Sequence, residues 1–554
     1  MTRFLVATDT PGIKQFVFGT DTLAEVRGAS ALLDRLNRLE MEDCLKRAPE
    51  VGITKVFANG GTGQFIVQAP DRAHVQRALD QLAAYYGEQT GGEMRPLAGV
   101  AEWAGEDETG YRAAVRAAFD DLHLQRSLAS GRPTVPTLPF VLECQSTSHL
   151  PAVPGVYRWG DERLVLSQAS RRKREESRQA RKREESRQAR RSLWSGWMES
   201  LDSNGHFLDK ANDLRYPDAE GIGEHSCGRR KGYVGLIYAD GNAMGRLVQE
   251  LDSREVCTAF SELVDKSVRD ACYEALSEVC APEIAEARAA LDRGENPGRL
   301  PADILLGGDD LLVMLPADRA LSFALLVTKA FERLTREGQA QLPEAARRFF
   351  ADRGLADRGL TISCGVALGP ARYPFYLLLD LAEELLRSAK RGGSADETKT
   401  DYWAPAYVDF HLLAGSASQE LSAIREEDYH SQSDRPRTLR PYWRDRLDLL
   451  RQAAERLQQA RLPRSKLQDL FEAALEPRQR QAQRRAEELF GRLREDKNHH
   501  ERRGLWDALS LLGPLDPYPW TRCNGRIATA LADLVEALDL FGHRRRHEPP
   551  SPAT

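Results

Sequence analysis

The chain has 554 residues, of which 41% are hydrophobic and 29% are charged, and its formal net charge is −5. This length predicts three or four domains, and the weakly acidic balance excludes a uniformly basic nucleic-acid-binding surface, although local basic patches can still occur. No apolar run reaches the roughly 18 residues of a membrane span, and the N-terminal segment lacks a signal-peptide cleavage site. Eight cysteines without a CxxC pair indicate reduced thiols and a cytoplasmic protein.

The first unit, residues 1–105, is predicted to alternate strands and helices. Its strand, helix, hairpin, helix and strand are expected at 4–10, 11–18, 56–67, 72–86 and 94–103. This order is that of a ferredoxin-like α+β fold, which forms the palm of many nucleotide polymerases and cyclases. We therefore expect a first palm domain here.

Residues 106–229 are predicted to connect this palm to the next unit, with one helix over 106–130. The sequence RKREESRQA then occurs twice in tandem, at 172–180 and 181–189. Residues 171–191 hold 11 Lys/Arg and 4 Glu, a local charge of +7 (11 − 4). The segment is either a nucleic-acid contact or a solvated, dispensable insert, and the absence of interleaved aromatic residues favours the insert.

The second unit, residues 230–409, repeats the order of the first. Its elements are expected at 233–240, 241–251, 303–314, 319–335 and 360–369, and the last strands of both units share Gly-Val-Ala. The two hairpins align without a gap, which sets Asp309 and Asp310 against Thr62 and Gly63. We therefore predict an α+β protein with two palms, of which only the second carries paired hairpin carboxylates.

The remaining sequence is predicted to be helical from 410 to 545, with a disordered tail at 546–554. Amphipathic helical patterns cover 442–460, 464–475, 478–496 and 526–541. Helices of this length with apolar stripes pack as a bundle.

The hairpin of the second palm carries the candidate chemistry. In a palm, the end of the first strand lies beside the central hairpin turn, so Asp240 is expected next to Asp309 and Asp310. Three carboxylates on rigid strands suit two Mg²⁺ or Mn²⁺ ions for nucleotidyl transfer. The carbonyl of Gly241 is expected to complete the metal shell. Taken alone, the GGDD sequence is equally consistent with an ordinary hairpin turn.

Several motifs resemble those of one known family. They are GGDD at 307–310, YADGNAMG at 238–245, AEELLRSAK at 382–390 and the segment 12–40. Together they are similar to the large catalytic subunit of type III CRISPR effector complexes. The resemblance implies synthesis of cyclic oligoadenylate from ATP, guide RNA and target RNA as partners, and other effector subunits bound through the C-terminal bundle. Because the chain starts directly with the first palm, we expect no N-terminal HD nuclease domain.

Further residues are expected to contact the nucleotide. Gly307 and Gly308 allow a tight turn and bring backbone amides close to the triphosphate. Asn242 is expected to bond a phosphate or ribose hydroxyl, or else to cap a helix. Ser363 is expected to contact adenine or ribose, or else to be a satisfied core hydroxyl. A helix-terminal lysine such as Lys390 is usually solvated, but the resemblance favours a triphosphate contact.

The first palm retains Asp9 but lacks both hairpin acids, so it cannot hold two ions. Its turn still offers the backbone amides of Gly60 and Gly61, which we expect to cradle the acceptor nucleotide.

Zinc is not expected. The region where the related family commonly carries a four-cysteine zinc module offers only Cys144, His149, His225 and Cys227, a weak signal for a tetrahedral site.

Two alternatives in function stay open. The chain could be a free-standing defence-signalling cyclase that makes a cyclic dinucleotide or oligonucleotide, or an inactive RNA-binding scaffold subunit. Intact Asp240, Asp309 and Asp310 argue against the scaffold.

Overall fold

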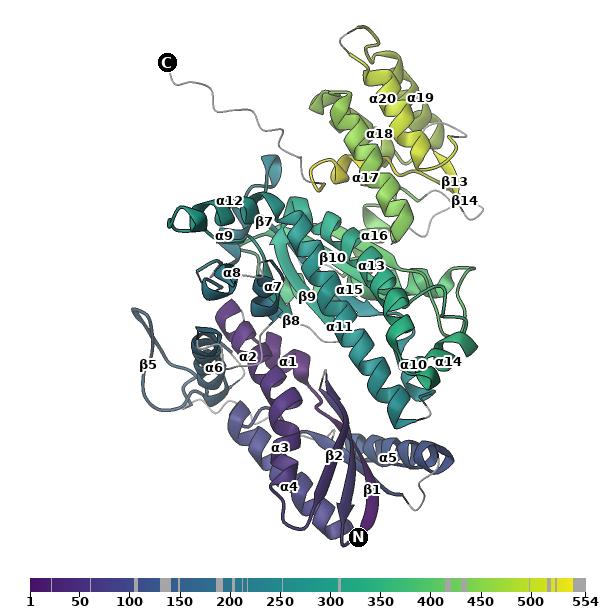
Figure 1. Ribbon diagram of the computed structural model, residues 1–554. Coiled ribbons are helices and arrows are strands. Elements are labelled where there is room, and N and C mark those ends of the chain that lie inside the picture. Colours follow the sequence, from purple (N-terminus) through teal and green to yellow (C-terminus); the bar gives the residue numbers. More distant parts are fainter. Residues whose placement is uncertain are drawn as a thin grey trace.

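The computed structural model describes most of the chain, and the statements below concern the described residues. These are 1–20, 22–59, 61–103, 108–129, 141–147, 150–185, 193–201, 205–211, 213–216, 218–251, 253–306, 310–413, 420–429, 436–497, 499–515, 520–523 and 526–541. The first palm and the C-terminal helices lie at opposite ends of the molecule, with the second palm between them (Figure 1). None of the described helices combines the length and apolar composition that a membrane crossing requires.

The first palm contains a four-stranded antiparallel sheet with the order β2-β3-β1-β4. Its strands are β1 (Thr2–Asp9), β2 (Gly52–Asn59), β3 (Thr62–Ala69) and β4 (Leu97–Glu102). Its helices are α1 (Ile13–Phe18), α2 (Leu23–Arg35), the π-helix Leu36–Glu40, α3 (Met41–Lys46) and α4 (Arg72–Thr90), and α5 (Glu108–Ala129) follows. The order is that of the predicted ferredoxin-like unit.

The second palm repeats this order within a larger sheet. Its first four strands are β7 (Tyr233–Gly241), β8 (Asp303–Leu306), β9 (Asp310–Pro316) and β10 (Ile362–Pro370), arranged β8-β9-β7-β10. Two further strands, β11 (Tyr407–Leu412) and β12 (Tyr442–Trp443), extend the sheet beyond β10. The predicted α+β class with two palms is therefore confirmed, whereas β11 crosses the domain boundary predicted at 409/410.

Helices cover both faces of the second sheet. They are α10 (Met244–Gln249), α11 (Arg254–Val279), α12 (Ala281–Asp292), α13 (Ala317–Gly338), α14 (Glu344–Asp352) and α15 (Phe375–Ala395). A Cβ added to Gly235 of β7 would lie 2.4 Å from the Cβ of Ala320, so α13 packs closely on that face. A Cβ added to Gly365 of β10 would meet the backbone of α15 on the opposite face.

Helices α5 and α15 occupy equivalent positions in the two palms. A Cβ added to Gly99 of β4 would lie 2.0 Å from the carbonyl oxygen of Ala118 in α5. A Cβ added to Gly365 would lie 2.2 Å from the carbonyl oxygen of Ala382 in α15. Only glycine permits such an approach, which explains why both strands carry glycine at this position.

The two palms pack against each other reciprocally. Helix α11 of the second palm contacts β2 of the first, and α2 of the first palm contacts β8, the equivalent of β2. Thr258 of α11 donates a hydrogen bond to the carbonyl of Val56 at 3.1 Å, and Arg27 of α2 donates to Asp303 of β8 at 2.5 Å. Both hydrophobic cores contain residues from both palms. The arrangement is that of a two-fold dimer built within one chain.

Charge also distinguishes the two sides of this interface. Among the described residues, four ion pairs join the palms, and in each the basic residue comes from the first palm or α5: Lys14–Glu383, Arg27–Asp303, Arg38–Asp265 and Arg112–Glu250. Lys14 and Arg112 are half exposed, so their pairs add little stability, whereas Asp303 is fully buried and needs its cationic partners.

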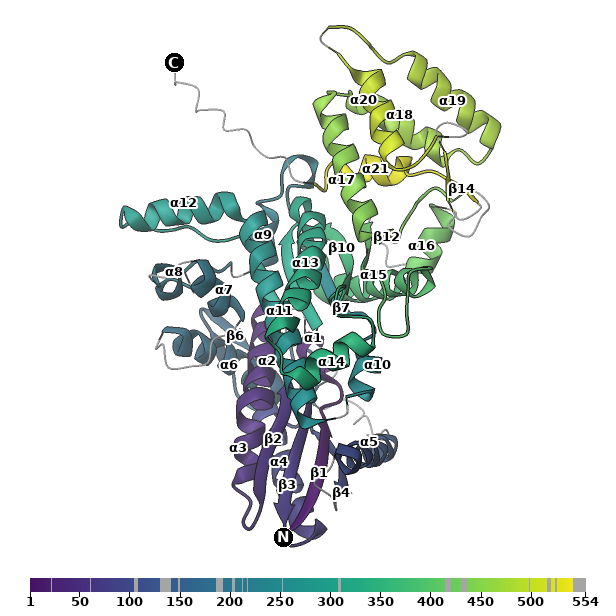
Figure 2. The same ribbon diagram turned by 45° about the vertical axis from the view of Figure 1, so that its right-hand side comes forward.

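The first copy of the basic repeat is not a solvated insert, so that expectation is wrong. It lies in α6 (Gln168–Glu185), which packs along α2 in both ribbon views (Figures 1 and 2). Lys173 donates to the carbonyl of Phe16, and Arg174 bonds Glu25 at 2.6 Å. These groups are buried, and a Cβ at Gly28 would lie 1.8 Å from the carbonyl oxygen of Lys173. Residues 186–192, within and just after the second copy, lie outside the described residues.

Aromatic residues from the connector also pack against α6. They belong to the hairpin of β5 (Tyr157–Trp159) and β6 (Glu162–Leu164), and the Arg178 guanidinium lies 4.5 Å from the ring centroid of Trp159. The many charges of α6 suggest a solvent-exposed helix. Its ion pairs and cation–π contacts lower the free-energy cost of burying part of it. The connector also contains α7 (Leu193–Leu201), α8 (His206–Asp209) and α9 (Ala219–Gly223).

The C-terminal region is mainly helical, as predicted. Its helices are α16 (Leu421–Glu427), α17 (Arg444–Gln459), α18 (Arg464–Leu475), α19 (Gln479–Gly491), α20 (Glu501–Leu511) and α21 (Leu531–Ala537). The helix expected over 526–541 is shorter, because β14 (Arg526–Ala528) pairs with β13 (Thr521–Cys523) just before α21. The tail at 546–554 lies outside the described residues.

A buried polar network fastens this region to the second palm. Arg440 pairs with Asp533 of α21 at 2.9 Å and with Glu536 at 2.6 Å, and its guanidinium lies 4.0 Å from the ring centroid of Phe410 in β11. Asp533 also accepts a hydrogen bond from Tyr442 of β12 at 2.7 Å. A buried cation bound by two carboxylates and an aromatic ring holds the C-terminal region against the second palm, because separating these partners would leave a buried charge unpaired.

Candidate metal and nucleotide site in the second palm

Strand pairing brings two of the predicted carboxylates together. Asp240 ends the buried strand β7, where it lies opposite Asp310 of β9 on one side and Ser363 of β10 on the other. Directly opposite residues in antiparallel strands project from the same face of the sheet. The side chains of Asp240 and Asp310 are therefore neighbours. Gly307, Gly308 and Asp309 lie outside the described residues.

Lys390 of α15 lies against this edge of the sheet. Its ammonium group donates to the Asp240 carboxylate and, at 3.1 Å, to the carbonyl oxygen of Gly241. These two oxygens are the ones that the sequence suggests as metal ligands, so the lysine marks a position suited to a cation. Carboxylate and carbonyl oxygens are the ligands that Mg²⁺ and Mn²⁺ prefer, and the residues present fit such an ion.

The first palm contains the same aspartate–base pair without the second carboxylate. Asp9 ends β1 opposite Thr62 of β3 and Leu97 of β4. Its carboxylate accepts a hydrogen bond at 2.9 Å from Arg126 of α5. Because α5 and α15 are equivalent, Arg126 is the counterpart of Lys390. At the equivalent position, the first palm thus has one carboxylate where the second palm has two, and Arg126 already neutralises it.

The strand registers correct the gap-free alignment of the two hairpins by one residue. Thr62 lies opposite Asp9 as Asp310 lies opposite Asp240, so Thr62 is the counterpart of Asp310 and not of Asp309. Phe57 pairs with Gln64, whereas Leu306 pairs with Leu312, so one residue fewer separates the equivalent paired positions in the second palm.

Asn242 has a structural role that the sequence did not suggest. Its side-chain amide donates to the Thr361 hydroxyl at 3.0 Å and to the Pro405 carbonyl at 3.4 Å, and it is buried. It is not the N-cap of α10, since Ala243 holds that position with a left-handed φ of 59°. A left-handed alanine is strained, and such strain next to a candidate site is a feature of functional loops. The predicted helix cap is therefore wrong, and the phosphate or ribose contact stays a prediction.

Ser363 matches the alternative of a satisfied core hydroxyl. Its side chain is buried, and its oxygen accepts a hydrogen bond from the backbone amide of Tyr407 at 3.2 Å.

The first-palm turn is only partly described, because Gly60 lies outside the described residues. Gly61 has a φ of 87°, and its carbonyl accepts a hydrogen bond from the Thr10 amide at 2.8 Å. A Cβ there would lie 2.1 Å from the Cδ1 of Ile13, so glycine is required.

Two residues near the carboxylates were missed by the sequence analysis. The hydroxyl of Tyr238 donates to Asp310 at 3.2 Å, and the ammonium of Lys14 from the first palm lies 4.8 Å from the Tyr238 ring centroid. Burial, reinforced by the negative charge of Asp310, raises the pKa of the Tyr238 hydroxyl well above its usual value. The available signal was the position of Tyr238, two residues before Asp240 and hence on the same face of the strand.

The four candidate zinc ligands are not seen to converge. Despite its burial, hydrogen bonds with Thr147 and Ser170 lower the pKa of Cys144 to about 7. His225 instead contacts Tyr216 and, at 3.6 Å, Glu283. His149 lies outside the described residues, among which no three His, Cys, Asp or Glu side chains are grouped to hold a metal ion.

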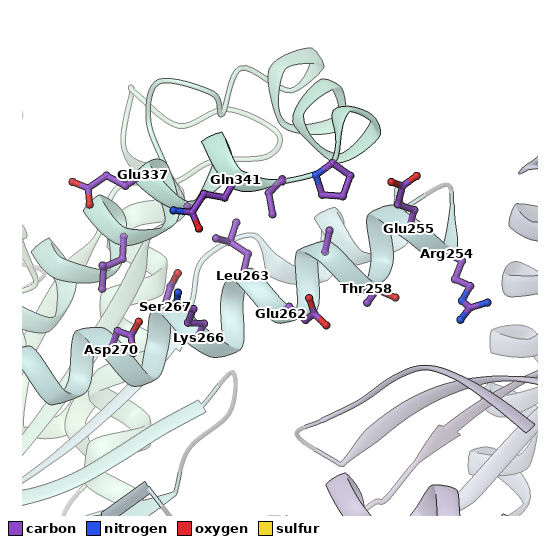
Figure 3. Close-up of a pocket in the computed structure, with 15 residues that line it drawn as sticks. Arg254, Glu255, Thr258, Glu262, Leu263, Lys266, Ser267, Asp270, Glu337 and Gln341 are labelled. Atoms are coloured by element: carbon purple, nitrogen blue, oxygen red, sulfur yellow. The ribbon is translucent and has the colours of Figure 1, made fainter. Parts of the chain in front are cut away.

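A cavity of about 770 Å³ lies away from the carboxylates, between α11 and the end of α13 (Figure 3). Leu263, Leu334 and Leu342 line its apolar part, and charged residues such as Glu262 and Lys266 lie along α11. It contains none of the predicted site residues.

Comparison with known proteins agrees with the fold. Residues 233–399 match the family model described as Cas10/Cmr2, second palm domain. The CRISPR system Cmr subunit Cmr2 of Pyrococcus furiosus is 24% identical over 221 residues, which are 37% of this chain and 22% of that protein. The match thus spans about a fifth of that relative's length.

Solved structures share the fold over nearly the whole chain. A Csm1–Csm4 cassette in complex with cA4 has a TM-score of 0.53 and 14% identity, and the match covers 98% of this chain and 70% of that one. A Csm1–Csm4 subcomplex of the type III-A CRISPR-Csm interference complex has a TM-score of 0.52, 16% identity, and coverage of 97% and 70%. Csm1 of T. onnurineus has a TM-score of 0.50, 16% identity, and coverage of 98% and 70%.

These comparisons confirm the predicted resemblance to the large, Cas10-type subunit of type III CRISPR complexes, and the similarity to the Cas10/Cmr2 second palm domain covers residues 233–399.

Proposed function

We propose that this chain is a metal-dependent nucleotidyl cyclase that makes cyclic oligoadenylate from ATP within a type III CRISPR ribonucleoprotein. The observation that carries the proposal is the pairing of Asp240 with Asp310 across β7 and β9, beside a carbonyl and an ammonium that already mark a cation position. Solved structures of a similar fold contain cA4 and cA3 bound to Csm1–Csm4 cassettes, which supports adenylate chemistry here.

In the proposed reaction, a ribose hydroxyl of one nucleotide attacks the α-phosphorus of the next ATP, and pyrophosphate leaves. Asp240, Asp309, Asp310 and the Gly241 carbonyl would hold two Mg²⁺ or Mn²⁺ ions. When bound, these ions activate the attacking hydroxyl and neutralise the departing pyrophosphate. Lys390 would then release Asp240 and pair with the triphosphate as a point charge. The amides of Gly307 and Gly308 would contact the same phosphates.

The first palm would bind the acceptor nucleotide rather than catalyse. Its turn at Gly60 and Gly61 is the counterpart of the catalytic turn. Asp9 is already paired with Arg126, and Thr62 faces it where the second palm has Asp310. A palm with one neutralised carboxylate lacks the charge to hold two divalent ions.

Guide RNA, target RNA and further effector subunits are the proposed partners, with the C-terminal helices as their contact region. The Arg-rich α19 supports this, since such surfaces suit an RNA backbone or an acidic protein. We expect slow ATP turnover by the isolated chain and stimulation by RNA-loaded partners, because assembly would set the angle between the palms.

The proposal is tested by incubating the purified chain with each NTP and Mg²⁺ or Mn²⁺, followed by mass spectrometry of the products. We expect cyclic oligoadenylate from ATP, no product after EDTA, and recovery when Mn²⁺ is added back. A cyclic dinucleotide, or fast turnover that RNA and partners do not change, would favour a free-standing signalling cyclase. No product with any nucleotide, even in the assembled complex, would favour an inactive scaffold.

A further inference from the structure

Tyr238 lies inside the interface between the palms, directly beneath the candidate site. Its side chain is 1% exposed, and its hydroxyl donates to Oδ2 of Asp310 at 3.2 Å. The ring is covered by Lys14, whose ammonium lies 4.8 Å from the ring centroid and 3.3 Å from Glu383 of α15. The first palm thereby touches a residue that bonds a carboxylate of the second.

The first palm has no such tyrosine. Tyr238 pairs with Gly365 of β10, and its counterpart in the first palm, Ala7, pairs with the equivalent Gly99 of β4. The counterpart of Asp310 is Thr62. The tyrosine and the carboxylate are thus both present in one palm and both absent from the other, as expected if they act as a pair.

The geometry explains what the pair does. A carboxylate can rotate and can bind a cation through one or both of its oxygens. A hydrogen bond to Oδ2 from a buried, rigid phenol restricts this rotation and so orients the carboxylate for an ion. A lysine over the ring adds a cation–π attraction and holds the ring against the sheet.

We propose that Tyr238 is a positioning residue that fixes Asp310 for divalent-ion binding, and that Lys14 of the first palm holds Tyr238 in place. This inference rests on the proposed function of the site. It adds that the non-catalytic palm supplies a residue supporting the metal centre, which would couple metal binding to the packing of the two palms.

The test is Mn²⁺ binding to the full chain, measured by electron paramagnetic resonance without nucleotide. Tyr238→Phe should weaken Mn²⁺ binding about 10-fold, the lower end of the effect of losing a hydrogen bond to a metal ligand. It should lower kcat for ATP while leaving KM little changed.

Lys14→Gln, a half-exposed position that should not affect folding, should weaken Mn²⁺ binding about 3-fold. Tyr86→Phe is the matched control, since this buried tyrosine donates to Asn37 at 2.8 Å in the first palm, and Mn²⁺ binding should not change.

Asp310→Asn separates the two levels of the argument. Loss of Mn²⁺ binding in Asp310→Asn, with wild-type binding in Tyr238→Phe, would overturn the role of Tyr238 and leave the proposed function standing. Unchanged Mn²⁺ binding in Asp310→Asn would overturn the proposed site itself. Wild-type affinity in Lys14→Gln would overturn the role of Lys14, and equal weakening in Tyr86→Phe would show that any buried tyrosine matters.

Discussion

The two palms share the order of four strands, and at one end of these strands they differ in a few side chains that matter for chemistry. Each places an aspartate at the end of its first strand and pairs it with a base from the equivalent helix, Asp9 with Arg126 and Asp240 with Lys390. The residue opposite that aspartate is Thr62 in one palm and Asp310 in the other. The fold therefore supplies the placement, and a second carboxylate is what we expect to turn a neutralised aspartate into a metal site.

The comparison also explains why a palm without paired carboxylates is retained. Helix α2 packs on β8 of the second palm, and α11 packs on β2 of the first. Each palm contributes residues to both hydrophobic cores, so removing either palm would expose apolar residues of the other. The first palm thus stabilises the second palm by packing against it, and its residue Lys14 lies next to the candidate site.

The largest expected effect is the difference in synthesis between variants that lose carboxylates of the second palm and a variant that loses the carboxylate of the first. Asp309→Asn combined with Asp310→Asn should reduce cyclic oligoadenylate synthesis at least about 1,000-fold, because bound metal ions contribute several kcal/mol of transition-state stabilisation. Asp9→Asn should reduce it less than about 3-fold, since its carboxylate is paired with Arg126. Product formation by mass spectrometry measures both. Equal losses in the two palms would mean that the roles are wrongly assigned.

The next effect concerns the basic repeat packed on the first palm. Deleting residues 171–191 should lower the free energy of unfolding by about 3 kcal/mol or more, because Glu25 would lose its ion pair with Arg174 and α2 would lose the packing of α6. Deleting one nine-residue copy, 172–180, should cost less than about 1 kcal/mol, since the identical second copy can then occupy the seat on α2. Urea unfolding compares the two deletions with the wild type. If the deletion of 171–191 were as stable as the wild type, the segment would be the dispensable insert that the sequence suggests.

A smaller effect arises from β11, which the first palm lacks. Burial, together with the charges of Arg425 and Arg440, lowers the pKa of His411 to about 3 from its usual 6.5. Unfolded chains bind this proton from about pH 6.5 downward while the folded chain does not, so stability should fall by up to about 1.4 kcal/mol per pH unit below that pH. Unfolding of His411→Gln across pH 7 to 5 should have a shallower pH dependence than the wild type. Identical slopes would show that His411 is accessible to protonation in the folded chain.

The smallest effect compares the two bases. Lys390 bonds the oxygens that a cation would use, so Lys390→Gln should strengthen Mn²⁺ binding a few-fold while lowering ATP turnover. Arg126→Gln in the first palm should leave Mn²⁺ binding unchanged. Electron paramagnetic resonance without nucleotide measures both variants. Weaker Mn²⁺ binding in Lys390→Gln would mean that the lysine supports the site and does not compete with the ion.

Both palms were predictable because strand patterns and a shared Gly-Val-Ala report on local structure. The neighbouring positions of Asp240 and Asp310 followed from the general order of a palm, without knowledge of the register. The one-residue offset between the hairpins was not predictable, because a turn of different length leaves the letters aligned while the pairing shifts. Only the bonded register distinguishes Thr62 from Gly63 as the residue facing Asp9.

The misses share a physical cause, which is that long-range partners decide the environment of a polar side chain. Lys173 is charged in a charged helix, yet it is buried because Phe16 and Gly28 lie against it. Tyr238 and Lys14 are more than two hundred residues apart and meet only through the packing of the palms. The core hydrogen bonds of Asn242 were missed because its partners, Thr361 and Pro405, come from distant loops.

The most direct test of a catalytic and a non-catalytic palm is to locate the metal. Crystals of the chain with Mn²⁺ and a non-hydrolysable ATP analogue should give anomalous difference peaks beside Asp240, the Gly241 carbonyl and Asp310, and no peak beside Asp9. A peak beside Asp9 as strong as that beside Asp240, or peaks in neither palm, would contradict the account.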